Sequence, residues 1–352
     1  MGLKSLKIGQ FRCFEDAELE PVPGINLVTG MNASGKTSLL EAIFLLGRGR
    51  SFRSARREAL IREGANALQA VGRLADGRVL GMEVSRDNWQ ARAGGEPVLQ
   101  LSQLSDWLAV QVMDPEVHRL VQEGPGERRR YLDWATFHVK PGFLEAWRNY
   151  QRALRQRNSA LKAGQPDASV ELWERTLVAE GERLDQYRRE TVQALEEPVR
   201  RVAETLLGVE VGVEYRPGHP QGQGLAEALA SHRARDRKAG MTQVGPHRAD
   251  LYLKLDDHKA RGWVSRGQQK LLAASLVLGQ ASLLAPLWGD RGVLLIDDPA
   301  AELDRSRCEA LLGLIAQSPF QVFVTALDDA ALPGLRADAR FHVEQGRVRR
   351  VV

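Results

Sequence analysis

The chain has 352 residues, of which 43% are hydrophobic, so it can form one large or two moderate domains with real cores. Its net charge of +4 is too small to indicate nucleic-acid binding by itself, and its seven histidines show no metal-ligand spacing. Two cysteines, Cys13 and Cys308, without paired or metal-like spacing argue against a disulfide framework. With no basic-then-apolar leader at the N-terminus, this composition predicts a cytoplasmic protein.

The first strong motif is GMNASGKT at residues 30–37, with the G-x-x-x-x-G-K-T spacing of a phosphate-binding loop. An apolar run at 25–28 predicts a buried strand before it, and residues 37–46 predict a buried helix after it. These flanks favour a nucleotide site over a chance glycine turn. Backbone N–H groups and the helix N-terminus would hold phosphate oxygens. The predicted nucleotide-binding residues are Gly30, Met31, Asn32, Ala33, Ser34, Gly35, Lys36 and Thr37. Lys36 would reach the β- and γ-phosphates, and the Thr37 hydroxyl would bind Mg²⁺.

The middle of the chain predicts a helical hairpin. Apolar residues recur at spacings of three, four or seven over 143–161 and again over 170–195, where Pro198 disturbs the pattern. Residues 162–167 would join the two helices. The first helix is rich in basic residues and the second in acidic ones, so mutual neutralisation of the pair is one interpretation.

The other interpretation of the basic residues is DNA binding. Arg128, Arg129 and Arg130 lie at the base of the predicted arm, and a second basic cluster occupies 232–238. Clustered Lys and Arg are sufficient for sequence-independent phosphate contacts. No aromatic–basic interleaving suggests base stacking on single strands, so the pattern favours a duplex or a junction of single- and double-stranded DNA as the ligand.

Residues 271–288 carry no charge and are long enough to be considered as a membrane span. Polar residues and Pro286 interrupt the segment, so we predict a helix buried inside a domain and no membrane association. The next segment, Gly292–Ile296, is a continuous apolar run typical of a strand in a parallel sheet. It ends in Asp297, predicted to hold Mg²⁺, and Asp298, predicted to orient the attacking water; the alternative is a strand ending in a capped turn.

The segment before the uncharged helix, Ser265-Arg266-Gly267-Gln268, resembles the signature motif of ABC-type ATPases. Downstream, Ala301-Glu302-Leu303-Asp304 resembles their D-loop, with Asp304 as its acidic residue. In that superfamily the signature serine and its helix N-terminus touch the γ-phosphate bound by a second subunit. The resemblance therefore implies an ATP-dependent homodimer.

Motifs along nearly the whole length are similar to those of the RecF family, bacterial DNA-repair ATPases related to the SMC proteins. They are Phe11-Arg12, residues 128–134, Arg155-Gln156-Arg157-Asn158, residues 245–251 and residues 265–268. The resemblance implies binding of ATP, Mg²⁺ and DNA, action with RecO and RecR to load RecA at gaps, and support of replication and the SOS response. It also places Arg12 beside the nucleotide and, by approximate position, Gln111 at the Mg²⁺ site.

We therefore predict an α/β fold: a split ABC-type ATPase head of residues 1–110 and 241–352, with a mainly helical arm domain inserted at 111–240. Some positions depart from the wider ABC pattern. Ala33 and Arg266 replace common glycines, Asp298 replaces a catalytic glutamate, and Thr325 stands where transport ATPases carry a switch histidine. Slow hydrolysis is expected, with the nucleotide acting as a conformational clamp. A transport-type ATPase subunit and a general SMC-like chromosome organiser are the alternatives.

Overall fold

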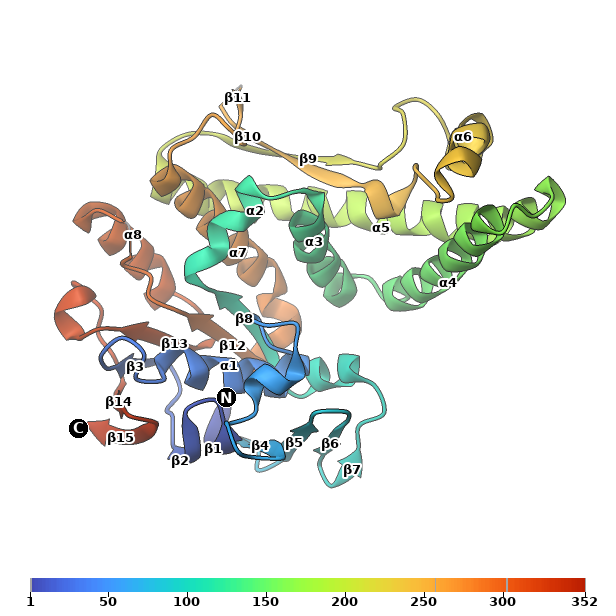
Figure 1. Cartoon of the computed structure of the whole chain (residues 1–352). Helices are drawn as coiled ribbons and strands as arrows, with labels where there is room; N and C mark the ends of the chain where they lie inside the picture. The colour runs from blue at the N-terminus through green and yellow to red at the C-terminus, as the bar shows by residue number, and fades with distance from the viewer. Residues whose placement is uncertain (1, 257, 302, 352) are drawn as a thin grey trace. The chain divides into compact units, whose positions relative to one another are not determined.

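The structure is a computed structural model that describes residues 2–256, 258–301 and 303–351. The chain divides into two compact units, each drawn in Figure 1. Unit 1 consists of Met1–Val117 and Ala285–Val352, and unit 2 of His118–Leu284.

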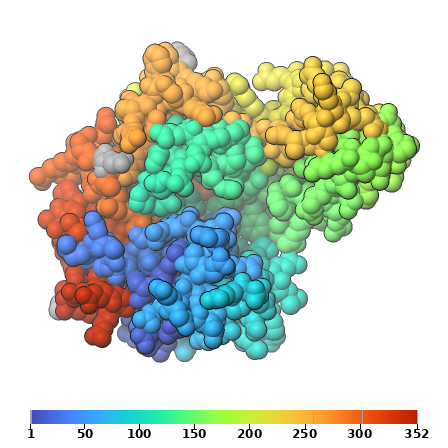
Figure 2. All heavy atoms as spheres, in the orientation of Figure 1, coloured from blue at the N-terminus to red at the C-terminus, as the bar shows by residue number. Residues whose placement is uncertain are grey.

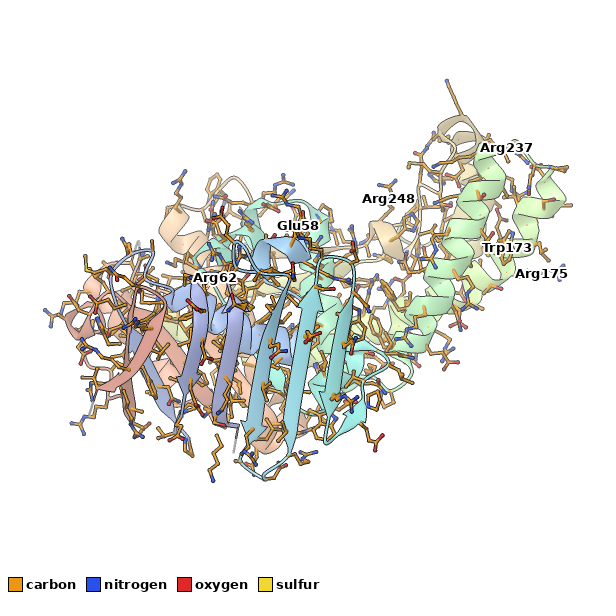
Figure 3. All side chains as sticks on the ribbon, turned by 60° about the horizontal axis from the view of Figure 1, so that its bottom comes forward. Glu58, Arg62, Trp173, Arg175, Arg237 and Arg248 are labelled. Carbon is orange, nitrogen blue, oxygen red and sulfur yellow. The ribbon has the colours of Figure 1, made fainter. Side chains whose placement is uncertain are left out.

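One sheet of unit 1 is antiparallel, with the strand order β2-β1-β4-β5-β6-β7. Figure 3 shows its strands side by side, with Glu58 and Arg62 in the segment above them. In β4 every second residue is buried, which is the alternation of a sheet with one face on a core. The strands are β1 (Leu3–Phe11), β2 (Phe14–Leu19), β4 (Ala67–Leu74), β5 (Val79–Ser85), β6 (Trp89–Ala93) and β7 (Glu96–Pro97).

The other sheet of unit 1 has the order β15-β14-β3-β13-β12-β8 and is parallel except for the hairpin strand β15. All residues of β12 and β13 are buried, as expected for central parallel strands covered on both faces. The strands are β3 (Ile25–Thr29), β8 (Ala109–Met113), β12 (Gly292–Ile296), β13 (Gln321–Ala326), β14 (Ala339–Glu344) and β15 (Arg347–Val351).

Helix α1 (Lys36–Arg48) joins the two sheets into one core. Its residues from Ser38 to Gly47 are buried, and its apolar side chains belong to a cluster with residues of both sheets. Helix α8 (Arg305–Ala316) follows β12. The unit also contains four short 3-10 helices: η1 (Arg57–Leu60), η2 (Leu101–Asp106), η5 (Gly289–Arg291) and η6 (Asp329–Ala331). A further one, η3, begins in it at Pro115.

Unit 2 is mainly helical and contains the predicted hairpin. Helix α4 (Phe143–Lys162) packs against the 41-residue α5 (Asp167–Leu207). The turn falls where the sequence predicts it, but α5 continues through Pro198 because Val199, Val202 and Leu206 beyond it are buried. The other elements are α2 (Arg119–Gln122), α3 (Pro125–Val139), α6 (Leu225–Ala239), η4 (Pro246–Arg248), α7 (Arg266–Trp288), β9 (Val211–Arg216), β10 (Asp250–Leu255) and β11 (His258–Lys259).

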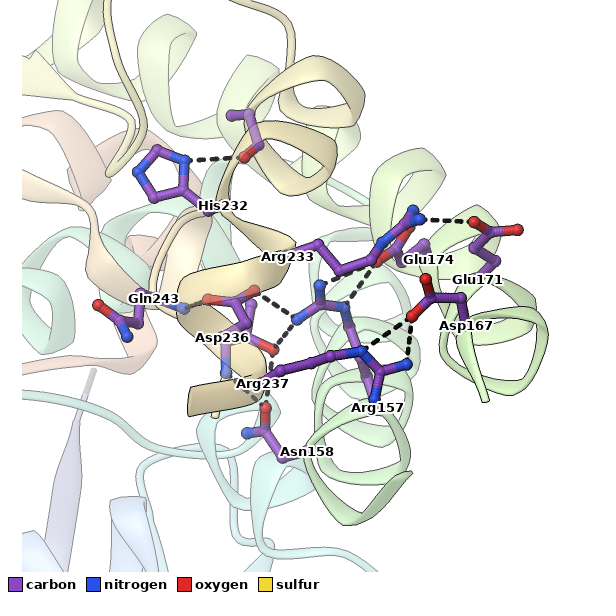
Figure 4. Close-up of polar contacts among 12 residues, drawn as sticks. Arg157, Asn158, Asp167, Glu171, Glu174, His232, Arg233, Asp236, Arg237 and Gln243 are labelled. Carbon is purple, nitrogen blue, oxygen red and sulfur yellow. Dashed lines mark hydrogen bonds and ion pairs between the residues drawn. The ribbon is translucent and has the colours of Figure 1, made fainter. Parts of the chain in front are cut away.

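A buried arginine ties α4, α5 and α6 together at one end of unit 2. The Arg157 guanidinium is fully buried and donates to Glu174 at 2.8 Å, to Asp236 at 2.7 Å and to the Thr242 hydroxyl at 2.8 Å (Figure 4). Arg237 pairs with Asp167 across the same helices. In Figure 2 the yellow atoms of α6 lie against the green hairpin. Part of the predicted basic cluster at 232–238 is thus neutralised by α5.

Residues 241–284, which the sequence analysis assigned to the head, group with the inserted segment in this structure. Strand β10 pairs along its length with β9, and the Tyr131 hydroxyl on α3 donates to the Leu276 carbonyl on α7 at 2.8 Å. These hydrogen bonds join the chain after residue 241 to the helices that precede it. The boundaries of the unit therefore lie at 117/118 and 284/285.

Among the described residues, one segment, Arg266–Arg291, is long and apolar enough to cross a membrane by length and composition. Of its most apolar window, 72% is buried inside the structure. Gly279 of α7 lies so close to Val199 of α5 that a Cβ there would meet Val199 atoms at 2.7–2.9 Å. A buried core helix has these properties, so the segment is weak evidence for a membrane span.

Candidate nucleotide site

The phosphate-binding loop connects β3 to α1 in a conformation that requires glycine at two positions. Gly30 has φ 153° and Gly35 has φ 119°. A Cβ on Gly30 would lie 2.3 Å from the Val343 carbonyl oxygen, and one on Gly35 would lie 2.7 Å from Cys13 Sγ. Ala33 adopts φ 63°, in the left-handed region where a glycine is common in such loops. The loop sits at the N-terminus of α1, whose first N–H groups have no intrahelical partner.

Lys36 lies across the loop. Its Nζ donates to the carbonyl oxygens of Gly30 at 2.6 Å and Met31 at 3.0 Å. Burial lowers the pKa of the Lys36 ammonium, and the carboxylates of Asp298 and Asp297 oppose that shift. Within the described chain, the buried Ser34 Oγ has no hydrogen-bond partner. The Lys36 ammonium is therefore bound only to carbonyl oxygens that a ligand can replace, and the Ser34 hydroxyl is free to donate. Both groups suit an anionic ligand.

Thr37 and Asp297 come together although 260 positions separate them. The Thr37 hydroxyl lies 2.9 and 3.1 Å from the two Asp297 carboxylate oxygens. Strands β3, β13 and β12 are neighbours and parallel, so their carboxyl ends share one edge of the sheet. The Asp297 side chain is 5% exposed. The sequence predicts both residues at this edge, but only the strand order explains their contact.

The residues present fit a magnesium ion bound with a nucleoside triphosphate. Mg²⁺ is held by one or two carboxylates and hydroxyls, with phosphates and water as its other ligands. Thr37 and Asp297 supply one hydroxyl and one carboxylate within hydrogen-bonding distance. No group of three or more His, Cys, Asp or Glu side chains gathers among the described residues, so an all-protein metal cage is absent there. Bound with phosphates, the ion would neutralise charge on their oxygens.

Thr325, at the end of the intervening strand β13, positions both aspartates. Its hydroxyl donates to Asp297 at 2.6 Å and accepts the backbone N–H of Asp298 at 3.0 Å. Asp298 has φ 49°, an uncommon left-handed conformation for a residue other than glycine, and its side chain is exposed. In the sequence, Thr325 stands out only as the replacement of a switch histidine. Its spacing from Asp297 in sequence gave no signal for this bracing role.

Arg12 lies beside α1, where it is bound by a buried acid. Its guanidinium makes two hydrogen bonds of 2.9 Å to Glu41, whose side chain is fully buried and also accepts from Ser51. Glu41 and Ser51 were not predicted as parts of this cluster. The predicted metal residue Gln111 is buried in β8, which pairs with β12 at Leu294.

The signature residues form the start of α7 in unit 2. Ser265 and Gln268 form a reciprocal cap: Ser265 Oγ accepts the Gln268 N–H at 3.3 Å, and Gln268 Oε1 accepts the Ser265 N–H at 3.0 Å. Arg266 is exposed, and Gly267 is half-buried in the first turn. In unit 1, Asp304 caps α8 by accepting from the Arg307 N–H at 2.9 Å. Glu302 of the predicted D-loop lies outside the described residues.

The prediction that three arginines contact DNA phosphates needs correction at Arg128. Its side chain is buried, with its guanidinium on Asp250 at 2.7 and 3.1 Å and on the Leu120 and Glu123 carbonyls. A group so enclosed is a structural brace, because a phosphate could reach it only by breaking these bonds. Arg129 is half-buried and donates to the Ala249 carbonyl at 2.7 Å. Only Arg130 is exposed, in an ion pair with Glu127.

The chain is similar to known proteins along nearly its whole length. The family model described as RecF/RecN/SMC N terminal domain matches residues 2–348. The chain is 41% identical to the DNA replication and repair protein RecF of Stenotrophomonas maltophilia (strain R551-3), with 99% of each chain covered. It is 40% identical to RecF of Azotobacter vinelandii, over 99% of this chain and 98% of the relative.

Solved structures give the same result. The recombination mediator protein RecF-ATP in the RecFOR pathway superposes with a TM-score of 0.90 at 26% identity, covering 100% of this chain and 98% of that one. The Smc head domain derived from Pyrococcus furiosus shares the fold alone, with a TM-score of 0.60 at 16% identity. The molecule is thus an ABC-type ATPase head of the SMC class with an inserted helical arm. The chain belongs to the RecF family of DNA replication and repair proteins.

Proposed function

We propose that this chain is a cytoplasmic, ATP-dependent DNA-binding protein of recombinational gap repair. It would act with RecO and RecR to load RecA, supporting replication and the SOS response. The observation that carries the proposal is the triad of Lys36, Thr37 and Asp297 at one edge of the parallel sheet, in a fold similar to RecF-ATP. Lys36 binds the β- and γ-phosphates of ATP, while Thr37 and Asp297 hold Mg²⁺.

Hydrolysis serves as a slow switch. Asp298 is one methylene shorter than a glutamate. Thr325 donates its hydroxyl to Asp297 and accepts the Asp298 N–H, and as a threonine it has no imidazole to offer the γ-phosphate. The chain is therefore a weak, DNA-stimulated ATPase in which ATP binding controls DNA affinity. Changing Asp298→Asn lowers turnover and preserves or prolongs DNA binding in ATP. Loss of DNA binding by a variant that still binds ATP would sink the clamp model.

The nucleotide is sandwiched in a homodimer. The phosphate loop lies in unit 1 and the signature in unit 2, so one chain carries one copy of each half-site. The start of α7 presents N–H groups and the Ser265 hydroxyl to the γ-phosphate held by Lys36 of a second chain. ADP lacks that phosphate, so hydrolysis releases the pair.

The decisive experiment measures oligomeric state by light scattering with ATP-Mg²⁺ and with ADP, with and without DNA. Wild type should dimerise in ATP and separate in ADP. Lys36→Ala should lose ATP binding, whereas Ser265→Arg should bind ATP and remain monomeric. Ser265 also caps α7, so Ser265→Arg could act by removing the cap. Ser265→Asp is the matched variant, because aspartate keeps the cap but repels phosphate, and it should also remain monomeric. A fully dimeric Ser265→Arg protein in ATP would contradict the sandwich.

Mixing the two variants sharpens the test. A heterodimer of Lys36→Ala and Ser265→Arg contains one doubly damaged site and one intact site. Partial recovery of ATP-dependent dimers is expected in the mixture and in neither variant alone. Absence of recovery, with both proteins folded, would argue against a signature acting in trans.

A further inference from the structure

A buried carboxylate fixes the orientation of Arg12 in unit 1. Glu41 is fully buried in α1, and its two carboxylate oxygens accept the Arg12 Nε–H and Nη2–H at 2.9 Å each. Two parallel bonds between a planar guanidinium and a carboxylate allow a single relative orientation. Arg12 lies at the turn between β1 and β2 with φ 52°, a left-handed conformation that is uncommon for a residue other than glycine. The pair with Glu41 therefore determines which edge of the guanidinium faces outward.

The turn that carries Arg12 touches the phosphate-binding loop. Cys13, the next residue, places its Sγ 3.9 Å from the Ser34 carbonyl oxygen. Glu41 lies four positions after Thr37, so both residues are on one face of α1. Helical side chains lean toward the N-terminus of their helix, which brings the Glu41 carboxylate toward the turn of Thr37. The Arg12 guanidinium is thus held close to the loop at which phosphates would bind.

The Nη1 edge of Arg12 has no acceptor in the part of the chain that the structure describes, and the side chain is 22% exposed. Three buried arginines also donate through Nε and Nη2 to carboxylates, but each of them donates its Nη1 to a further protein acceptor: Arg128, Arg157 and Arg188. An arginine that serves only the fold has its donors satisfied inside the protein. The remaining N–H groups of Arg12 are instead available to a ligand, and an anionic oxygen such as that of a phosphate suits them best.

We propose that Glu41 is a positioning residue for the nucleotide: it holds Arg12 by one edge and thereby presents the Nη1 edge to a phosphate of ATP. Glu41 itself touches no phosphate. The pairing also neutralises the carboxylate, which would otherwise place a negative charge one helical turn from Thr37 and repel the triphosphate. The proposal rests on the proposed ATP-binding function and adds to it a buried acid that acts through Arg12.

The test is a double-mutant cycle on the affinity for a fluorescent ATP analogue, with wild type, Glu41→Gln, Arg12→Ala and the double variant. Glu41→Gln keeps the size of the side chain but replaces one acceptor oxygen with an NH₂ group, so the carboxamide no longer accepts from both Arg12 nitrogens. It should weaken ATP binding roughly 10-fold when Arg12 is present. In the Arg12→Ala background the same substitution should leave the affinity equal or higher, because Glu41 then has no group to position and its unpaired charge is removed.

Two further variants separate positioning from a change in the fold. The Ser51 hydroxyl donates to the same carboxylate, so Ser51→Ala removes a hydrogen bond of Glu41 and leaves Arg12 in place. Its affinity for the ATP analogue should stay within about 2-fold of wild type. Arg12→Lys keeps a positive charge beside Glu41 but has no second N–H edge, so it should bind the analogue about as weakly as Arg12→Ala. Urea denaturation of each variant checks that it is folded.

An equal loss of affinity on Glu41→Gln with and without Arg12 would overturn the proposal, because the acid would then act without the arginine. A loss in Ser51→Ala as large as that in Glu41→Gln would also overturn it, since the effect would come from the packing of α1. So would wild-type affinity in Arg12→Lys, a result that does not depend on whether Glu41→Gln folds. Failure of the proposed ATP-binding function is a different result, in which wild type itself does not bind the analogue.

Discussion

The phosphate loop of unit 1 and the Arg157 cluster of unit 2 both contain buried or half-buried charge, but they differ in how that charge is satisfied. The Arg157 guanidinium has two carboxylates and a hydroxyl fixed by three different segments. Lys36 rests on two carbonyls of its own loop, and Ser34 Oγ beside it has no partner in the described chain. A buried cation that is paired with carboxylates of the protein, such as Arg157, stabilises the fold. A cation bound only to backbone carbonyl oxygens, such as Lys36, can exchange them for a ligand.

This difference predicts that removing Arg157 affects stability most. Arg157→Ala leaves the buried Asp236 without its cation and Glu174 with Arg233 alone, which should cost about 3–5 kcal/mol of unfolding free energy. Urea denaturation measures the change. Arg200→Ala, on the exposed face of α5 with its pair Glu197, is the matched control and should cost less than about 1 kcal/mol. If Arg157→Ala and Arg200→Ala lost the same unfolding free energy, the Arg157 cluster would contribute no more to stability than a surface ion pair.

Lys36→Ala should have the converse effect. It should lower ATP affinity roughly 100-fold, because charge-assisted bonds to phosphate are lost, while unfolding free energy changes by less than about 1 kcal/mol. Titration with a fluorescent ATP analogue measures the affinity. The control is Lys7→Ala, an exposed lysine of β1 paired with Glu18, which should bind ATP as wild type does. If Lys36→Ala lowered the unfolding free energy as much as Arg157→Ala does, Lys36 would be a residue that stabilises the fold.

The two regions also differ in how far sequence predicts them. The loop motif, Asp297 and the hairpin turn follow from local spacing, because each depends on residues close together in the chain. Local spacing cannot show which strand lies between β3 and β12, and Thr325 acts through that position. The sequence does not show that Arg128 is enclosed, because its acid, Asp250, lies 122 positions away at the start of β10. Runs of arginine do not reveal such partners.

His247 provides a pH test of the structural side of the comparison. It is half-buried, and its ring nitrogens lie 2.7 Å from the Tyr150 hydroxyl and 3.0 Å from the Thr242 carbonyl oxygen. Burial lowers the pKa of its imidazole from 6.5 to about 4; the Thr242 hydrogen bond opposes this, and nearby arginines add to it.

Because the folded pKa lies below the unfolded one, this stabilisation is complete above about pH 6.5 and is lost as pH falls toward 4. Between pH 7 and pH 5 the protein should lose about 2 kcal/mol through this group. His247→Gln should flatten that part of the stability profile measured by urea denaturation. A profile of unchanged slope in the variant would assign the acid sensitivity to other groups.

Ala33 tests strain in the loop. At φ 63° an alanine costs about 1 kcal/mol more than glycine, so Ala33→Gly should stabilise the fold by up to about 1 kcal/mol. Ala234→Gly, at an exposed position inside α6, should destabilise by about the same amount. Thermal unfolding with and without ATP measures both. If the two substitutions shifted stability in the same direction, the left-handed strain at Ala33 would be negligible.

The smallest effect concerns Arg130, the one arginine of the 128–130 run whose charge faces solvent. Its partner Glu127 is a surface acid one helical turn away, and such pairs contribute little, so a duplex phosphate can replace it. Arg130→Ala should reduce the slope of log affinity against log salt by roughly 0.9 for duplex DNA of any sequence, with little change in stability. Glu127→Ala should raise duplex affinity at low salt, because it frees the guanidinium. Arg128→Ala should leave the slope unchanged and lower stability, since its charge is completed by Asp250 inside the protein. An Arg130→Ala slope equal to that of wild type would mean that the arm base does not touch the duplex, and the phosphate contacts would have to be sought elsewhere on the protein.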